Sequence, residues 1–548
     1  MQERLKQKKS FIVILIAIAY GCFLIAHAWL ACKYTAKDMV GFRYEIPLLL
    51  GSMFVLAGNI FIVWLIFIKK ASISTIYAGM SFVILSLFLW TQTPLHHHDN
   101  EFHYDSTYVM SNILLGEESP VGLAGGRVRT YLRRQCDEFM HYCAYNNFLP
   151  SYADMQREMF SNPKTEETQL VERKAYQGAV SEPLYFYIPQ AIGFCVARIL
   201  ELNVYWLMYL GRLFLAVAST FITWKAIKNA PAYKEIFFVC GLIPTTIWSY
   251  TTVSRDALIL AFSFYYTSKC LQLVYEEKKC SWLDYALLLG ALLLLAPYKF
   301  VYIPLALLLG LLVCKKSAGR KMNGKLIGVL AVAVIIVIGF FVLINYDYMK
   351  KFLMGANTAA IDGSMPFTLP YVLANPLEAL IIVLRTIIKS TIRFAANMIA
   401  IGDYGGGIHK EMAVIELIFI AIMILWNNRT GKRKGEIRLT VMERGIIIGS
   451  WLAVSGMIYL AYLLLTPCTN DVIIGIQGRY FTPVLPLMLI SFCGIKVIKN
   501  IKNKYWVKIM DFLDQESVRQ GVMLGIYGLA LFVVVNMFVW VMTYVHPV

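Results

Sequence analysis

Ionisable side chains gather in residues 91–108, which read Thr-Gln-Thr-Pro-Leu-His-His-His-Asp-Asn-Glu-Phe-His-Tyr-Asp-Ser-Thr-Tyr. This stretch follows an apolar run from Ser72 to Trp90, which at about 20 residues is long enough to cross a bilayer. Charged groups beside hydrocarbon cost free energy unless they are paired or used, so the cluster is a candidate catalytic site. A polar cap that only keeps the loop hydrated is the alternative. This stretch alone supports the two interpretations equally.

Further polar groups stand at turns between apolar runs, on the same side of the membrane by the topology derived below. These turns contain Ser254-Arg255-Asp256, Pro297-Tyr298-Lys299, Asp403 within residues 401–407, and Gln477-Gly478-Arg479-Tyr480. They mix carboxylates with cations, as a site for an anionic lipid requires. Every turn needs polar residues, which is the simpler explanation. Several mixed turns on one face nevertheless favour a functional site.

These residue types suit the attack of a sugar or polymer hydroxyl on an anomeric carbon whose leaving group is a lipid phosphate. A carboxylate must take the hydroxyl proton, and either Asp99 or Glu101 fits that role. Cations must stabilise the departing phosphate, and the candidates are Lys299, Arg255 and Arg479. Arg479 is favoured because a guanidinium binds phosphate with two parallel hydrogen bonds.

A divalent metal ion is a weaker alternative for the histidine-rich segment. His96, His97 and His98 are consecutive and point in different directions, so one or two of them at most share an ion. His98 with Asp99 or His103 is a possible pair. We expect no metal and no other cofactor.

Composition sets the class of protein. The chain has 548 residues, of which 58% are hydrophobic, and its mean hydropathy is +0.61. These values indicate a helical membrane protein that crosses the bilayer many times. The formal net charge is +17, but Lys and Arg stand mostly in short segments between apolar runs. That distribution follows the positive-inside rule and argues against nucleic-acid binding.

About 13 apolar runs are long enough to span the membrane. They cover residues 11–31, 47–68, 73–92, 204–228, 234–252, 256–274, 282–297, 299–314, 325–346, 412–427, 444–466, 480–498 and 520–544. With this count the basic segments share one face, which we take as cytoplasmic. The N-terminus is then cytoplasmic, and the C-terminus and the histidine-rich segment are extracytoplasmic, in a plasma membrane.

The polar segments divide the chain. We expect N-terminal spans in residues 1–92, an extracytoplasmic loop with an interfacial helix in 93–203, central spans in 204–346, a second such loop in 347–411, and C-terminal spans in 412–548. Residues 376–400 carry Arg385, Lys389 and Arg393 at intervals of four, which predicts a basic interfacial helix. The stripe either binds lipid phosphates or reaches to the headgroups. Residues 151–177 are expected to be helical.

The chain resembles a family of bacterial multi-pass membrane proteins, catalogued as a domain of unknown function within the GT-C glycosyltransferases. Several motifs carry the resemblance, and they occur in the same order along the chain. They are Asp99-Asn100-Glu101-Phe102-His103-Tyr104, Glu182-Pro183-Leu184-Tyr185-Phe186-Tyr187 with Pro189-Gln190-Ala191-Ile192-Gly193, Gly211-Arg212-Leu213, Pro244 through Ser254-Arg255-Asp256-Ala257, Lys299 with Tyr302, Ile401-Gly402-Asp403-Tyr404-Gly405, and Gln477-Gly478-Arg479-Tyr480-Phe481. The resemblance covers residues 90–500.

The resemblance implies a GT-C fold, with an essential acidic residue in the first large outer loop. Asp99 matches that residue, and His103 matches a histidine that follows it. The family places a second acidic residue directly after the first, where this chain has Asn100 and then Glu101. Enzymes of that superfamily use polyprenyl-phosphate-linked sugars and invert the anomeric centre.

We therefore expect an inverting glycosyltransferase at the outer face of the plasma membrane. Its donor would be a polyprenyl-phosphate-linked sugar, and its acceptor a cell-envelope polysaccharide, glycolipid or protein. The expected substrate-binding residues are Arg255, Asp256, Lys299, Asp403, Arg479 and Tyr480. A lipid-linked saccharide transporter or flippase is one alternative, and a polysaccharide polymerase or ligase is another. A flippase needs ionisable residues along the middle of several spans, and few are present.

Overall fold

A computed structural model describes residues 2–35, 44–94, 100–117, 121–122, 127–140, 151–161, 170–176, 184–276, 281–295, 300–313, 365–401, 410–429, 439–494, 504–513 and 515–544, with isolated positions between 314 and 364. Asp99, Lys299 and Asp403 lie outside the described residues. So do His96, His97 and His98.

Seven helices in the described part of the chain are long and apolar enough to cross a membrane. They are α1 (Gln2–Thr35), α2 (Glu45–Val63) with its π-helical continuation η2 (Trp64–Ile68), α3 (Ile73–Thr91), α9 (Val204–Asn229), α12 (Asp256–Tyr275), α20 (Val441–Leu463) and α24 (Glu516–Tyr544). Each falls on a predicted span. The prediction of a helical, multi-pass membrane protein is confirmed.

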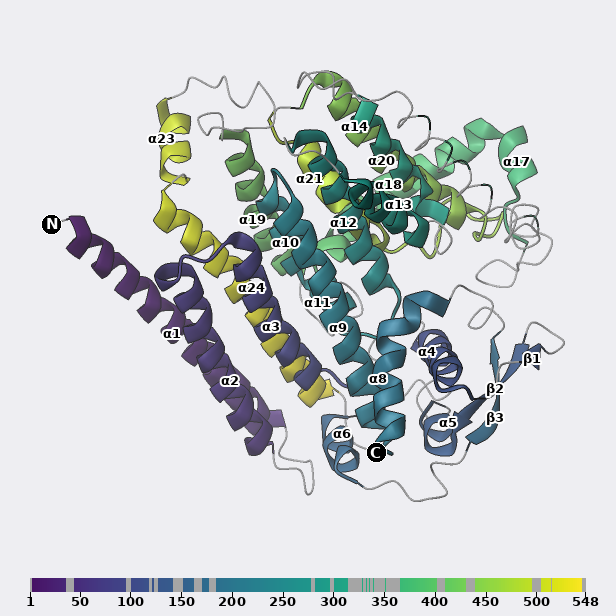
Figure 1. Cartoon of the computed structure of the whole chain (residues 1–548), viewed down its shortest axis with the longest axis horizontal. Helices are drawn as coiled ribbons and strands as arrows, with labels where there is room; N and C mark the ends of the chain where they lie inside the picture. Colours follow the sequence, from purple (N-terminus) through teal and green to yellow (C-terminus); the bar gives the residue numbers. More distant parts are fainter. Residues whose placement is uncertain are drawn as a thin grey trace.

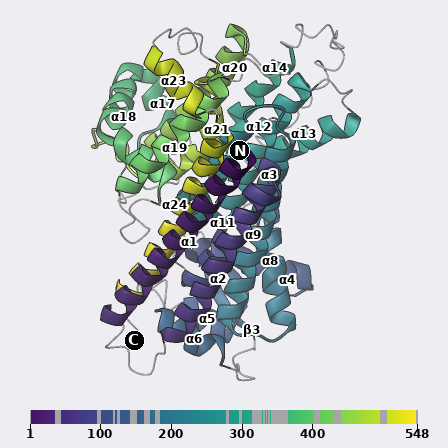
Figure 2. The ribbon, with the colours of Figure 1, turned by 90° about the vertical axis from the view of Figure 1, so that its left-hand side faces the viewer.

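The first and last of these helices run side by side in the same direction (Figures 1 and 2). Tyr20 in α1 donates a hydrogen bond of 2.9 Å to the carbonyl of Gly528 in α24. Because both helices enter at the same end of the bundle, the start of α1 and the end of α24 lie at opposite ends. This arrangement agrees with an odd number of crossings.

Five further predicted spans are shorter or interrupted helices, and the predicted span 325–346 lies outside the described residues except for isolated positions. α13 (Trp282–Leu295), η6 (Phe300–Leu309) with α14 (Gly310–Val313), and α19 (Lys410–Arg429) are continuous. The run 234–252 is instead two helices, α10 (Lys234–Leu242) and α11 (Pro244–Tyr250). Proline disfavours helical backbone in the residue before it, and Ile243 is accordingly extended, with ψ 146°. The run 480–498 begins as a 3-10 helix, η9 (Gly478–Val484), and continues as α21 (Leu485–Ser491).

The segment after α3 forms a small layer at the end of the bundle where α24 ends (Figure 1). It contains α4 (Asn100–Leu115), β1 (Val121–Gly122), β2 (Arg127–Arg133), α5 (Arg134–Met140), α6 (Tyr152–Met159) and β3 (Leu170–Tyr176). The strands pair antiparallel in the order β1-β2-β3. The expectation that residues 151–177 are helical holds for α6 but is wrong for β3. Pairing with the distant β2 stabilises β3 as a strand, and a local pattern does not reveal such a partner.

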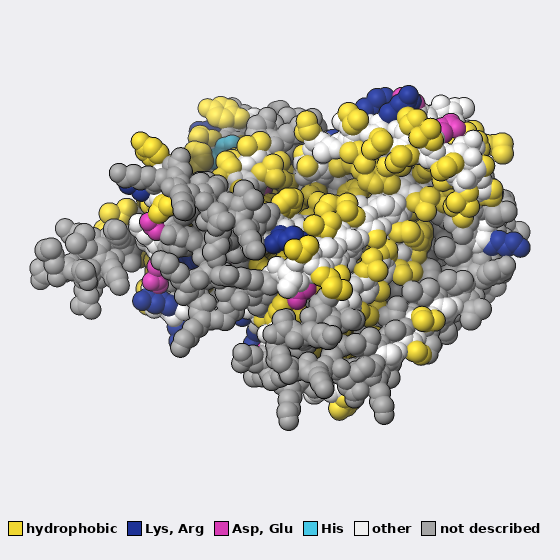
Figure 3. All heavy atoms as spheres, turned by 90° about the horizontal axis from the view of Figure 1, so that it is seen from above, with side chains coloured by type: hydrophobic (Ala, Val, Ile, Leu, Met, Phe, Trp, Pro, Cys, Tyr) yellow, Lys and Arg dark blue, Asp and Glu magenta, His cyan; other side chains and the backbone are white. Residues whose placement is uncertain are grey.

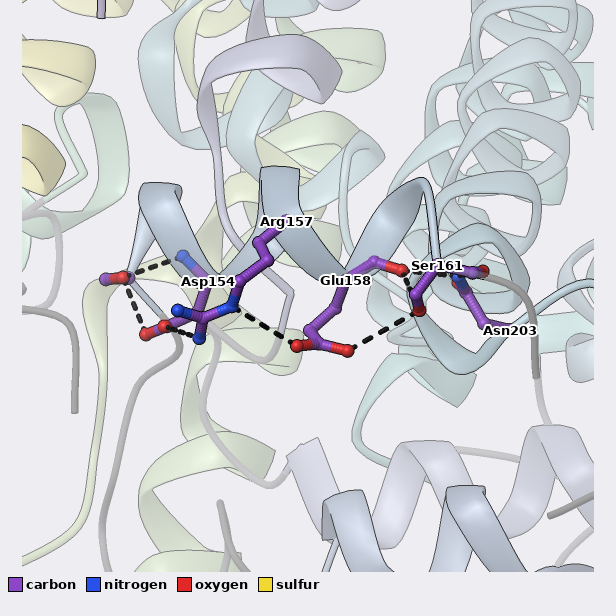
Figure 4. A network of polar contacts seen from close by, with 6 residues as sticks. Asp154, Arg157, Glu158, Ser161 and Asn203 are labelled. Atoms are coloured by element: carbon purple, nitrogen blue, oxygen red, sulfur yellow. Dashed lines mark hydrogen bonds and ion pairs between the residues drawn. The ribbon is translucent and has the colours of Figure 1, made fainter. Parts of the chain in front are cut away.

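Helix α6 is tied to the start of α9. Ser151 caps α6 by accepting from the backbone N–H of Asp154, and Arg157 pairs with the Asp154 carboxylate at 2.6 Å (Figure 4). Asn203, the N-cap of α9, donates to the carbonyls of Glu158 and Ser161 at 2.5 and 3.0 Å. These bonds fix this small layer to the helix bundle.

Two predicted interfacial helices are present as helices. The first is η5 (Leu184–Tyr187) followed by α8 (Ile188–Ile199), and the second is α18 (Pro376–Ile399), which the short α17 (Leu369–Ala374) precedes. Helix α18 buries Ile382 and Thr386, whereas Ile388 and Ile392 are more than four-fifths exposed. An exposed apolar side next to Arg385 and Lys389 suits a membrane interface, and that location stays a prediction. α23 (Lys504–Leu513) is a further short helix.

The surface agrees with a membrane setting. Hydrophobic side chains spread over much of the described surface on the face in Figure 3, and charged ones form small separate groups. The buried core contains the same residue types, and the many large apolar side chains left exposed suit a hydrocarbon environment.

Candidate functional site

His103 is the best-defined member of the predicted cluster. It lies in the first turn of α4 and is 5% exposed. Its Nδ1 is 2.8 Å from the hydroxyl of Tyr187 in η5, and its Nε2 is 3.0 Å from the hydroxyl of Ser254. One imidazole therefore joins α4, η5 and the turn that precedes α12.

The aromatic surroundings of His103 keep water away from it. Tyr104 and Tyr108, the next two aromatic residues along α4, are fully buried and lie against Phe194 of α8. Burial raises the pKa of Tyr104 well above its ordinary value, so its hydroxyl stays neutral. The part of α4 that follows His103 is therefore held in place by apolar packing against α8.

Arg255 and Asp256 follow Ser254 directly and begin α12. The guanidinium carbon of Arg255 lies 5.1 Å from the ring centre of Phe102, the neighbour of His103. Asp256 stands in the first turn of α12, where the helix dipole favours a negative charge. Its carboxylate is 3.9 Å from the guanidinium of Arg479 in η9.

Arg479 is held by aromatic residues as well. Its guanidinium lies 5.3 Å from the ring centre of Tyr480, and that ring stacks on Tyr462 of α20 at 5.4 Å. The Tyr480 carbonyl accepts a 2.9 Å hydrogen bond from the hydroxyl of Tyr302 in η6. The Arg479 side chain is 8% exposed, so its charge is largely shielded from water.

Six of the nine predicted site residues fall on described positions. His103, Arg255, Asp256, Arg479 and Tyr480 form one chain of contacts through Ser254 and Phe102. Glu101 is in the first turn of α4, two residues before His103. Asp99 precedes the first residue of that helix, and Lys299 precedes η6, which contains Tyr302. The role of every site residue remains a prediction.

Tyr187 and Ser254 were not singled out individually, although both stand inside quoted motifs. Their hydroxyls become informative only when the fold brings them to the two nitrogens of His103. Tyr302 was named only as part of a motif with Lys299, and Tyr462 was missed for the same reason. Buried tyrosines in apolar helices read as core residues until their partners are known.

No group of three or more metal-binding side chains occurs among the described residues. The segment 95–99, which holds most of the histidines, is outside them. The expectation that the site works without a metal therefore stays a prediction.

Residues 82–488 match the family described as "Predicted membrane protein (DUF2142)". The chain belongs to this family. The match contains every described residue of the site and confirms the resemblance seen in the motifs. No curated protein sequence matches the chain. The crystal structure of ArnT from Cupriavidus metallidurans bound to undecaprenyl phosphate is similar to the chain, with a TM-score of 0.39 and 10% sequence identity over 86% of this chain and 76% of that one.

Proposed function

We propose that this membrane protein is an inverting GT-C glycosyltransferase. It transfers a sugar from a polyprenyl-phosphate donor to a cell-envelope polysaccharide, glycolipid or protein at the outer face of the plasma membrane. The observation that supports this best is the contact of Arg479 with Asp256, close to the hydrogen bonds that His103 forms with Tyr187 and Ser254. This contact joins a phosphate-binding residue type to the start of α12, and the His103–Ser254 hydrogen bond joins the turn before α12 to α4.

In this proposal Arg479 and Arg255 stabilise the charge that develops on the departing polyprenyl phosphate. Both guanidiniums lie beside aromatic rings, where lower polarity strengthens their attraction to a phosphate. Asp99 takes the proton from the acceptor hydroxyl as the oxygen attacks the anomeric carbon from the opposite side. The configuration at that carbon inverts, because one displacement occurs.

His103 then holds the site together. Each ring nitrogen has a hydroxyl partner. These two bonds join the start of α4 to η5 and to the turn before α12. Those bonds keep the start of α4, which follows Asp99 in the sequence, next to the turn that leads into Arg255.

The alternatives differ in what they demand of the spans. A flippase must carry a charged headgroup past ionisable residues in mid-membrane. Arg212 is such a residue, but hydrogen bonds to Gln92 and Thr251 already engage its guanidinium. A polymerase or ligase uses the same chemistry and differs only in its acceptor.

The test replaces Asp99 by Asn in membranes supplied with radiolabelled lipid-linked sugars from the producing cells. We expect transfer into the polysaccharide or protein fraction to be abolished, while binding of undecaprenyl phosphate, measured by native mass spectrometry, persists. Asp471→Asn is the matched control, because Asp471 is an exposed aspartate on another loop. Full transfer by the Asp99→Asn protein would defeat the proposal.

A further inference from the structure

Arg212 is a buried cation that the proposed reaction does not use. It lies within α9, one of the candidate membrane spans, and is 4% exposed. An arginine inside a span costs free energy unless its donors are satisfied, and such residues usually have a function. Its motif, Gly211-Arg212-Leu213, is one of those that mark the family resemblance.

The guanidinium of Arg212 joins the ends of two other helices. Nε donates to the Thr251 carbonyl at 2.5 Å, at the end of α11. Nη1 donates to the Gln92 carbonyl at 2.9 Å, and Nη2 to the Gln92 side-chain oxygen at 3.2 Å, at the end of α3. Thr251 completes the group, because its hydroxyl lies 3.2 Å from the same Gln92 oxygen. Three helices therefore meet at one cation.

Both helix ends lead into the site. Gln92 is the C-cap of α3, and the chain runs from it through the histidine-rich segment to Asp99. Thr251 stands three residues before Ser254, whose hydroxyl bonds His103. A shift of either helix end would alter the contact between His103 in α4 and Ser254 in the turn before α12.

Helix α8 holds the same turn from a second direction. Gln190 donates to the Val253 carbonyl at 3.3 Å. α8 reaches this position because it crosses α9 closely, at Gly193 and Gly211. A Cβ on Gly193 would lie 2.4 Å from the Leu210 carbonyl oxygen. Side chains from α8 and α9 thus bind the carbonyls of Val253 and Thr251, one and three residues before Ser254.

We propose that Arg212 is a positioning residue that sets the start of α4, which holds His103, and the Ser254–Asp256 turn in the relative position that transfer requires. The planar guanidinium reaches the acceptors of both helix ends at once, and a lysine ammonium, as a point charge on a flexible stem, does not. The catalytic part of this inference rests on the proposed function. The structural part does not.

Hydrogen–deuterium exchange of the full-length protein in nanodiscs tests the structural part. Arg212→Lys keeps the charge, and we expect exchange of peptides covering 249–256 to rise about tenfold. Arg198→Lys is the matched control. Arg198 is also a buried arginine, in α8, but it bonds Asn112 and Glu117 at the end of α4. Its replacement should speed exchange at 108–117 and leave 249–256 unchanged.

Transfer by the same proteins tests the catalytic part. Arg212→Lys should lower kcat about tenfold with KM for the lipid-linked donor changed less than about twofold, because donor contacts are intact. Gln92→Met removes the side-chain oxygen that accepts from Arg212 Nη2 and from the Thr251 hydroxyl, but it keeps the two backbone carbonyls that bind the guanidinium. We therefore expect a smaller loss of the same kind. This variant keeps the proposal testable if Arg212→Lys fails to fold.

Two results would overturn the role of Arg212. One is unchanged exchange at 249–256 in both Arg212→Lys and Gln92→Met. The other is an equal rise there in Arg198→Lys, which would show general loosening. If wild-type protein shows no transfer, the proposed function fails, and the exchange data still decide whether Arg212 positions the two segments.

Discussion

The guanidinium of Arg479 lies 3.9 Å from the carboxylate of Asp256, which joins η9 to the first turn of α12. A lipid phosphate that binds Arg479 would compete with this carboxylate for the same donors. The ion pair therefore opposes phosphate binding in the empty site.

This competition gives the two residues opposite effects on affinity. We expect Arg479→Gln to weaken binding of undecaprenyl phosphate about tenfold, because a charge-assisted contact is lost. Asp256→Asn should tighten it. Native mass spectrometry of both proteins measures the change. Weakening by both substitutions would mean that Asp256 orients Arg479 and does not compete with the ligand.

The two hydroxyls on His103 should act as a unit. Tyr187→Phe and Ser254→Ala each delete one hydrogen bond to the ring, and each should cost about 1 kcal/mol of stability. Both should also reduce transfer. Because they share one imidazole, the effects of the double substitution should be less than additive. Thermal unfolding and transfer assays measure these effects.

Tyr185→Phe provides the control, since this neighbouring hydroxyl bonds the carbonyl of Leu294 and does not reach His103. Loss of transfer in Tyr185→Phe equal to that in Tyr187→Phe would assign the effect to η5 in general.

Much of the architecture could be predicted from the sequence because lipid imposes long apolar helices. The run 73–92 became α3, and its end at Gln92 is where polar residues begin. The span 234–252 shows the limit, because Pro244 breaks it. β3 was missed because a strand depends on a partner some 40 residues away.

The site was predictable only by residue type. Arg255, Asp256 and Arg479 stood out as charges at the ends of apolar runs. The partners of His103 did not, since a hydroxyl in a helix end carries no signal until the fold places it. Arg212 was visible as a charge inside a span. Its role was not, because its main partners are backbone carbonyls, which every residue has and which the sequence does not distinguish.

A substitution at Gly478 would test how closely η9 must approach α18. A Cβ at Gly478 would lie 2.1 Å from the Phe394 carbonyl oxygen and 2.7 Å from the Met398 nitrogen. Both are backbone atoms, so Gly478→Ala must push η9 away and should cost about 1–3 kcal/mol. Arg479 moves with it, so phosphate binding should fall as well.

Gly456→Ala in α20 is the control, because nothing lies within 4 Å of its Cβ position. Alanine is the better helix former, so this change should stabilise the protein by about 0.5–1 kcal/mol. Thermal unfolding in detergent measures both variants. An unchanged or raised Tm for Gly478→Ala would show that the contact with α18 is loose.

The loop before η9 is tied to α18 by two contacts that should respond differently to pH. Thr386 is fully buried, and its hydroxyl oxygen accepts from the Ile473 N–H at 2.9 Å. Asp471 and Lys389 form an ion pair at 3.0 Å, and more than half of each side chain is exposed. Lys389 lowers the pKa of the Asp471 carboxyl below its ordinary value.

The folded state therefore favours charged Asp471. The contribution of the pair is present above the pKa of the unfolded chain and is lost as pH falls through the lower folded pKa. Because the pair is exposed, it should be small and should vanish in high salt. Asp471→Asn should match wild type below that pH. Thr386→Val leaves a buried N–H without its acceptor and should cost about 1–3 kcal/mol at every pH. Thermal unfolding from neutral to acidic pH separates them, and a pH-dependent deficit in Thr386→Val would contradict this division.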